Sequence, residues 1–182
     1  MQRRLNELVD YLDAQRSALL RVASTLPADR WSERPAPDRW SVVELLEHLS
    51  KVEHSCARVV AKRAAEVRAE GHPAELATGS VLGALDSRAL TDRSSRMTSP
   101  ERVAPAGGLS RVQALADLAA SRAEMMQAIG IADGLALETV TCPHARLGDL
   151  NLYQWILFLG QHEERHLAQL AEITEQLAPA AR

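Results

Sequence analysis

Apolar residues recur along the chain at intervals of three and four, the spacing that gathers them on one face of an α-helix. The first such stretch covers Leu5–Leu26, and Pro27 marks its end. A second covers Ser41–Arg68, after a proline-rich connector, and begins with Ser41 followed three residues later by Glu44. This pair is the capping-box pattern, in which each side chain bonds the other residue's backbone N–H. The pattern predicts two long helices.

The second half of the chain predicts two more long helices. Ser110 and Gln113 repeat the capping-box pattern and open a helix that closes at Gly130–Gly134. The last helix is predicted over Asn151–Leu177, after a loop at Thr141–Gly148. Convincing strand alternation is absent from this loop and from the rest of the sequence, so we predict no strand.

A link of about forty residues joins the second and third helices, and glycine and proline interrupt it throughout. A short helix is predicted within it near Val81–Leu90. A link of this length can cross the whole bundle, so the second and third helices need not be antiparallel neighbours. The pattern therefore predicts an all-α protein, a four-helix bundle with a long crossover between helices 2 and 3, built as a single domain over residues 1–182.

The composition agrees with a folded domain and excludes several classes of function. The 182 residues are 46% hydrophobic, 25% charged and only 3% aromatic, which favours helix over strand. The net charge of −3 leaves no basic excess for binding nucleic acid. We predict no signal peptide and no membrane span. Cys56 and Cys142 lie far apart without a CxxC pair, which favours a reducing cytoplasm over a disulfide framework or thiolate-bound zinc.

Two histidines lie on the apolar face of the last predicted helix. With Leu159 at the centre of that face, His162 and His166 fall about 60° and 20° away, at about 100° per residue. They are four residues apart in the sequence, so their imidazoles lie one helical turn from each other. This spacing lets two imidazoles reach one metal ion.

A third histidine, His48, lies on the apolar face of the second predicted helix, between Leu45 and Val52. A single buried histidine is more often a core residue whose ring is hydrogen-bonded. Three inward imidazoles are costly to bury unless something satisfies them all. His48, His162 and His166 therefore predict a site for Zn²⁺, Ni²⁺ or a related divalent metal, with at least one position left for water or substrate.

The segment His162–His166 also spells HExxH, the zinc-peptidase signature, with Glu163 in the general-base position. Glu172 and Glu175 stand about 9 and 13 Å farther along the same helix and cannot complete such a site. We therefore predict His48 as the third ligand and no peptidase activity. Glu163 is the candidate catalytic residue, which would orient a ligand or relay a proton; a buried salt bridge is an equal alternative.

Other side chains near these motifs are weaker candidates. We expect His54 to face solvent or a neighbouring helix, and His144 either to line the mouth of a pocket or to lie in a surface turn. Arg122 either binds a substrate carboxylate or pairs with a carboxylate such as Glu163. Cys142 would be reactive if exposed. The remaining residues are predicted to pack the interior: Trp40, Trp155, Met125, Met126 and Cys56.

Three segments carry a family resemblance. Arg39–Leu49 has a Trp-Ser start and a later His-Leu pair, Leu147–Trp155 precedes and opens the last helix, and His162–Gln169 contains His-x-x-x-His followed by Gln. Together, and in this order, they resemble the DinB-like family, also called DinB/YfiT-like. The resemblance runs over nearly the whole chain.

The resemblance implies a four-helix bundle that is frequently a homodimer, with a divalent metal on His48, His162 and His166. Some members of the family resemble enzymes that use a low-molecular-weight thiol such as bacillithiol or mycothiol. We therefore hypothesise a metal-dependent thiol S-transferase or hydrolase with a small-molecule substrate, in which the ion activates a thiol or water. The alternative is a non-catalytic, stress-associated dimeric binding protein with a vestigial metal site.

Overall fold

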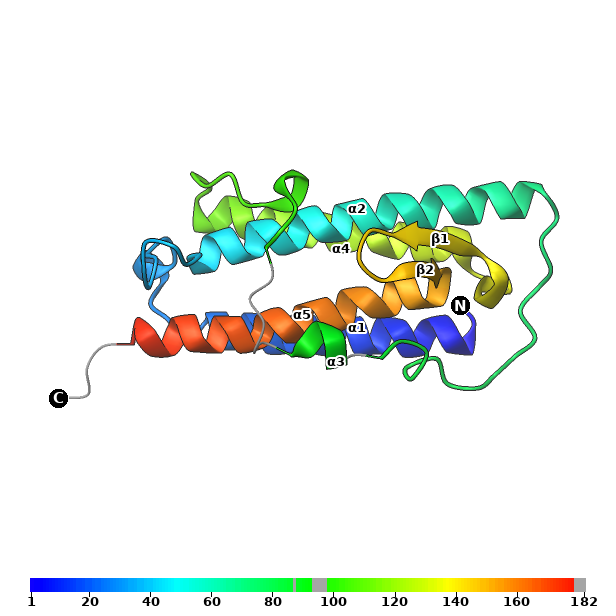
Figure 1. Cartoon of the computed structure of the whole chain (residues 1–182), viewed down its shortest axis with the longest axis horizontal. Helices are drawn as coiled ribbons and strands as arrows, with labels where there is room; N and C mark the ends of the chain where they lie inside the picture. The colour runs from blue at the N-terminus through cyan, green and yellow to red at the C-terminus, as the bar shows by residue number, and fades with distance from the viewer. Residues whose placement is uncertain (87, 93–97, 179–182) are drawn as a thin grey trace.

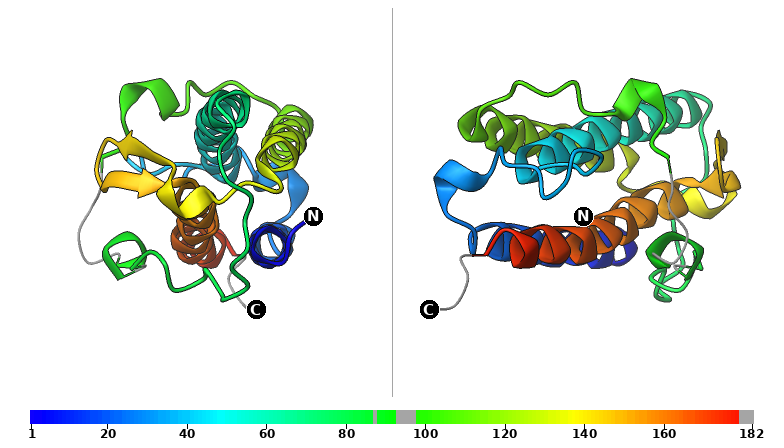
Figure 2. Two further views of the ribbon diagram at one scale, coloured as in Figure 1. Left: turned by 90° about the vertical axis from the view of Figure 1, so that its right-hand side faces the viewer. Right: turned by 60° about the vertical axis from the view of Figure 1, so that its left-hand side comes forward.

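Four long helices form a bundle in the computed structural model, which describes residues 1–86, 88–92 and 98–178. They are α1 (Arg3–Ala23), α2 (Val42–Ala69), α4 (Arg111–Ala132) and α5 (Leu152–Gln176). Figure 1 shows α2 beside α4 and α1 beside α5, and the end-on view of Figure 2 shows the four helices around a common interior. The predicted four-helix bundle is confirmed.

The long crossover makes α2 and α4 parallel neighbours. Both helices start at the left of Figure 1, and the link between them leaves one end of the bundle and returns at the other. Short elements lie along this link: α3 (Arg88–Thr91) and the 3₁₀ turn η2 (Glu101–Val103). The short helix predicted near Val81–Leu90 is wrong for most of its length: residues 81–86 form turns and bends, residue 87 lies outside the described residues, and only the residues of α3 in this range are described as helical.

The predicted starts of α2 and α4 are correct because local side-chain chemistry determines them. Ser41 and Glu44 form the capping box of α2, and Ser110 and Gln113 form that of α4. A third capping box, not predicted from the sequence, opens α5 from Asn151. In each box the side chains satisfy backbone N–H groups that have no partner within the helix.

A small β-hairpin contradicts the prediction that the chain contains no strand. β1 (Thr141–His144) and β2 (Gly148–Asn151) pair antiparallel directly before α5, where the sequence pattern predicts a loop. Gly148 has a φ of 73°, a conformation that glycine adopts without strain. Each strand has only four residues, so no alternation could be recognised in the sequence. The two remaining short elements are 3₁₀ turns, η1 (Ala28–Arg30) and η3 (Leu137–Thr139).

A layer of buried polar residues divides the core into two apolar clusters. On α1, Leu12 belongs to one cluster and Leu19 to the other, with the buried Arg16 between them. On α5, Glu163 lies in the same way between Leu159 and Leu170. The layer therefore crosses the bundle near its middle.

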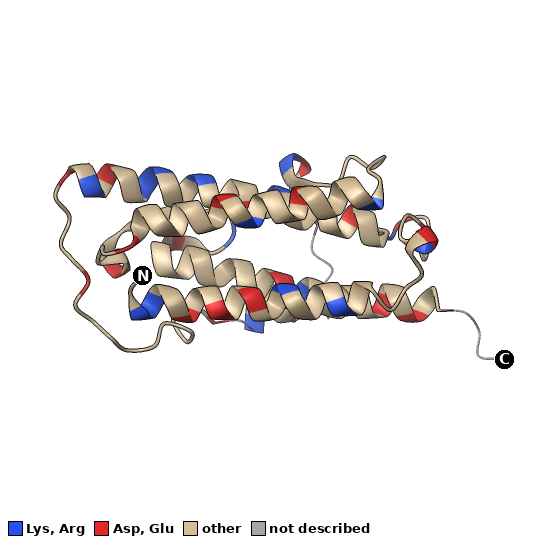
Figure 3. Ribbon diagram, turned by 180° about the vertical axis from the view of Figure 1, so that it is seen from behind, with Lys and Arg blue, Asp and Glu red and all other residues tan. Residues whose placement is uncertain are grey.

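The outer surface carries mixed charge. Seen from behind, basic and acidic positions alternate along the long helices without a face of one sign (Figure 3). Among the described residues, no helix is both long and apolar enough to span a bilayer.

Candidate metal centre

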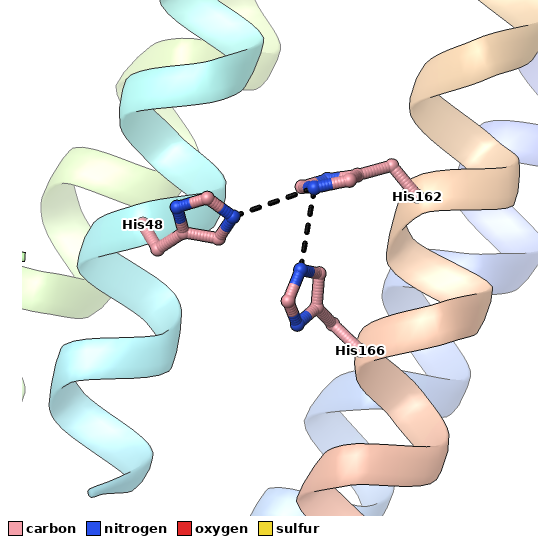
Figure 4. A group of neighbouring side chains, drawn as sticks. All are labelled: His48, His162 and His166. Atoms are coloured by element: carbon pink, nitrogen blue, oxygen red, sulfur yellow. Dashed lines mark hydrogen bonds between the residues drawn. The ribbon is translucent and has the colours of Figure 1, made fainter. Parts of the chain in front are cut away.

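The three predicted histidines converge at one point between α2 and α5. The Nε2 atom of His162 lies 3.4 Å from Nε2 of His48 and 3.2 Å from Nε2 of His166. All three candidate ligand atoms lie within 4.8 Å of one another. Figure 4 shows His48 reaching across from α2 toward the two imidazoles of α5. Their grouping from two separate helices is what the sequence predicted.

Neighbouring groups orient two of these rings so that Nε2 is the candidate ligand atom. Nδ1 of His48 lies 2.8 Å from the carbonyl oxygen of Val103, and Nδ1 of His166 lies 2.9 Å from Oε1 of Gln169. Because both oxygens only accept hydrogen bonds, each Nδ1 donates and each Nε2 carries a lone pair. A ligand histidine held through its other nitrogen is the usual arrangement in metal sites.

The donor set fits a divalent cation better than it fits a hydrogen-bonded cluster. A single proton on His162 Nε2 cannot be donated fully to both unprotonated Nε2 atoms, whereas one cation satisfies all three lone pairs. A tetrahedral ion with bonds of about 2.0–2.1 Å requires ligand atoms about 3.3 Å apart, close to the two measured separations. Three imidazoles suit Zn²⁺, Ni²⁺ or a related ion.

Burial favours the neutral, metal-binding form of two of these imidazoles, His48 and His162. Burial lowers the pKa of His48, and burial together with His166 and His48 lowers the pKa of His162 well below its ordinary value. Trp40 packs against the site, with its ring centroid 4.9 Å from that of His48 and 6.4 Å from that of His166. Trp40 is therefore a packing residue, as predicted, and the side chains it packs against are candidate ligands.

The three histidines line a cavity of about 1070 Å³. Other walls come from the crossover around Val103, the hairpin around His144 and the aromatic rings of Trp155 and Phe158. A cavity of this size admits a small molecule beside the candidate metal position.

Glu163 lies in a different environment from the histidines. It is buried in ion pairs with Arg16 and Arg122, and both arginines also pair with Glu53. Burial raises the pKa of Glu163, although both arginines oppose this effect. Glu163 is not among the described residues that line the cavity, so the salt-bridge alternative describes its contacts. Its predicted catalytic role stays a prediction.

The other sequence candidates are placed as follows. Arg122 pairs with carboxylates inside the bundle, and His54 bonds Glu124 of α4 at 2.7 Å. His144 is half-buried in the cavity wall, its ring centroid 5.0 Å from Trp155 and 4.7 Å from Phe158. Of the predicted packing residues, four are buried or partly buried in the core: Trp155, Met125, Met126 and Cys56.

Sequence reasoning missed several groups around the site. Arg16 occupies the apolar face of α1 between Leu12 and Leu19, a position whose spacing could have revealed it as an inward charge. The Val103 carbonyl has no such signal, because every residue carries a carbonyl and this one lies 55 residues from His48. The cavity-lining Arg102 and Arg146 come from the crossover and the hairpin turn, which show no periodicity.

Fold and site together define a class of protein: a four-helix bundle with a long crossover and a candidate three-histidine metal centre between its second and last long helices. The family model of the DinB superfamily matches residues 11–170. The chain therefore belongs to the DinB superfamily, and the resemblance seen in its motifs is confirmed.

Two further proteins are similar to this chain. An uncharacterized protein of Bacillus subtilis (strain 168), YuaE, is 28% identical over 159 residues, which is 85% of this chain and 90% of YuaE. The crystal structure of TT2238, a four-helix bundle protein, superposes with a TM-score of 0.61 at 23% identity, over 92% of this chain and 98% of that one. The second likeness shows the fold.

Proposed function

We propose that the protein is a divalent-metal-dependent enzyme, a low-molecular-weight thiol S-transferase or hydrolase. The observation that carries the proposal is the convergence of three imidazoles, two of them oriented through Nδ1, on the wall of a cavity large enough for a small molecule. When bound there, a divalent cation acts as a Lewis acid that lowers the pKa of a thiol or water.

The chain's own residues hold and shield this site. His48, His162 and His166 supply the ligand atoms, while the Val103 carbonyl and the Gln169 side chain orient two of the rings. The aromatic rings of Trp40 and Phe158 pack against the histidines and shield them on those sides.

The protein's own thiols are unsuited to act as nucleophiles, which supports an external thiol. Cys56 is buried at the cavity wall, and burial raises the pKa of its thiol. Burial also raises the pKa of the half-buried Cys142 thiol. The thiolate is the reactive form, so a reaction through sulfur here requires a low-molecular-weight thiol as cosubstrate.

A proton-relay role for Glu163 is part of the proposal and can be separated from a structural one. Oε2 of Glu163 is buried and has no hydrogen-bond partner among the described residues. A Glu163→Gln variant that folds and keeps its metal but loses turnover would support proton transfer. If the folded variant keeps wild-type turnover and loses only thermal stability, Glu163 acts through its ion pairs alone.

The test of the proposed function is an assay of the purified protein with bacillithiol or mycothiol and an electrophile such as monochlorobimane, alongside ester hydrolysis. We expect turnover that disappears with a chelator, returns with Zn²⁺ or Ni²⁺, and is lost in His162→Ala but kept in the control variant His72→Ala. His72 lies outside the site and bonds the carbonyl of Ala136. Absence of metal-dependent turnover in every combination would contradict the proposal.

A further inference from the structure

Positive charge is concentrated around the cavity although the chain as a whole is acidic. The net charge of the chain is −3, yet the cavity wall carries four arginines, and Asp38 is the one carboxylate among the described residues that line it. The four are Arg39, Arg102, Arg146 and Arg165. This imbalance contrasts with the alternating charges along the helices (Figure 3).

Two of the four arginines, Arg102 and Arg146, are exposed and have no carboxylate partner among the described residues. Arg39 pairs with Glu172 at 2.9 Å, and Arg165 donates to the carbonyls of Leu90 and Asp92. The exposed Arg146 guanidinium donates a hydrogen bond to the neutral carbonyl of Thr98. Arg102 is exposed, and no ion pair joins it to a described carboxylate. The positive charges of Arg102 and Arg146 are therefore available to a ligand.

His144 lies close to both of these charges and presents a hydrogen-bond donor. Its Nδ1 accepts hydrogen bonds from the backbone N–H groups of Arg146 and Leu147, at 3.3 and 3.2 Å. A ring nitrogen that accepts is unprotonated, so the proton of the neutral ring is on Nε2. Burial, followed by Arg102 and Arg146, lowers the pKa of His144 and keeps the ring neutral. The hairpin turn thus fixes the tautomer with Nε2–H as donor.

We call Arg102, Arg146 and His144 the basic corner of the cavity. An apolar surface joins this corner to the three histidines of the candidate metal centre. The Phe158 ring lies between the two, with its centroid 4.7 Å from that of His144 and 5.5 Å from that of His162. Trp155 extends the same wall. A ligand whose charged group binds at the basic corner would therefore contact the three histidines only if an apolar part about the size of one aromatic ring packs along Phe158.

We propose that the cavity binds an organic anion, whose carboxylate or phosphate group is held by Arg102, Arg146 and the Nε2–H of His144. Guanidinium groups pair with both kinds of anion through parallel hydrogen bonds. The apolar part of the molecule packs on Phe158 and Trp155, and its reacting group faces the histidine centre. This inference rests on the proposed function, because it names the substrate class of the same site.

The experiment measures the binding of three probes by ligand-observed NMR titration: phenylpropionate, phenyl phosphate and the neutral phenylpropanol. We expect both anions to bind more tightly than the alcohol. In the double variant Arg102→Gln/Arg146→Gln, the Kd of each anion should rise roughly tenfold, with the Kd of the alcohol unchanged. The matched control is Arg3→Gln/Arg21→Gln, which removes the same charge from exposed positions of α1 and should leave all Kd values unchanged.

A second variant tests the His144 donor of the basic corner without removing a charge. His144→Phe keeps a ring against Trp155 and Phe158 but lacks the N–H donor, so the Kd of the anions should rise roughly threefold. Thermal unfolding of each variant confirms that it is folded. Equal binding of anions and alcohol by the wild-type protein, or wild-type anion binding by the double variant, would overturn the inference.

Repeating the titrations with and without Zn²⁺ separates this inference from the proposed function. Anion binding that requires Zn²⁺ and is unaffected in the double variant would mean that the metal alone holds the anion, which overturns the inference and supports the metal site. Anion binding that depends on the arginines, in a protein that binds no metal, would support the anion site and contradict the proposed enzyme.

Discussion

Each candidate ligand depends on a particular neighbour for its orientation. Gln169 follows His166 by three residues on α5, so a regular helix brings its amide oxygen to Nδ1 at 2.9 Å. The corresponding neighbour of His48 is the Val103 carbonyl, supplied by the crossover. The first neighbour was part of the motif quoted from the sequence, whereas the second exists only in the folded chain.

We predict that Gln169→Ala lowers metal affinity without removing a ligand. Loss of the acceptor frees the His166 ring to rotate and to change tautomer, so the Kd for Zn²⁺ should rise roughly 10- to 100-fold. Competition with a chromogenic chelator measures the Kd. Gln176→Ala, an exposed position at the end of α5, is the control and should bind Zn²⁺ like the wild-type protein. Unchanged affinity in Gln169→Ala would show that this hydrogen bond has no orienting role.

Gly160 is required where α1 and α5 approach each other. A Cβ added at Gly160 would lie 2.2 Å from Cε1 of Tyr11, too close for any real contact. We predict that Gly160→Ala lowers the free energy of unfolding by about 1–3 kcal/mol, because the Tyr11 ring or a helix must shift. Gly130→Ala, whose Cβ would meet nothing within 4 Å, should instead be neutral or stabilising by about 0.5–1 kcal/mol. Urea unfolding of both variants checks the contrast, and equal effects would contradict it.

At the scale of the elements, one polar cluster joins all four long helices. Arg16 comes from α1, Glu53 from α2, Ser121 and Arg122 from α4, and Glu163 from α5. Such a cluster tolerates few alternative alignments, because sliding one helix would leave a buried charge without its partner. We infer that it sets the register of α5 against α2 and so keeps the three histidines together.

The acid sensitivity of this cluster is predictable from Glu53. Burial alone would raise the pKa of Glu53, but Arg16 and Arg122 outweigh burial and hold this pKa below its ordinary value. A carboxyl with a lowered folded-state pKa adds stability above its unfolded pKa of about 4.3. That stability is lost as the pH falls through the folded-state pKa.

We therefore predict two effects of Glu53→Gln. At neutral pH the free energy of unfolding should fall by about 3 kcal/mol, because two arginines lose a buried partner. Below about pH 4.3 the stability of the variant should fall less steeply with pH than that of the wild-type protein. Urea unfolding at a series of pH values measures both, with the exposed Asp117→Asn as control. Parallel pH curves for wild-type protein and Glu53→Gln would show that Glu53 does not contribute.

The elements that the sequence predicted are those determined by local signals. Apolar spacing and the capping boxes at Ser41 and Ser110 located the long helices to within a few residues. The hairpin at Thr141–Asn151 was missed because its pairing depends on a tight turn and on His144 accepting backbone N–H groups, neither of which creates a periodic pattern. Within the crossover, packing against other elements decides the structure.

At the scale of the whole molecule, the cavity exists because the crossover and the β-hairpin add walls beside the contact between α2 and α5. The histidines could be predicted because they lie on the apolar faces of regular helices, which the spacing of apolar residues reveals. The cavity wall, however, also contains Arg102 from the crossover and Arg146 from the hairpin. Such tertiary neighbours are not encoded by spacing along the chain. The predicted homodimer, which the structure of one chain does not test, stays a prediction.

The central claim is that three histidines from two helices bind one metal ion, and metal analysis tests it most directly. Protein purified without a histidine tag is incubated with Zn²⁺ or Ni²⁺, desalted and measured by plasma mass spectrometry. We predict one ion per chain in the wild-type protein and in His54→Ala, and none in His48→Ala, because only His48 belongs to the converging group. A wild-type protein that retains no metal, or a His48→Ala variant that retains a full equivalent, would contradict the account.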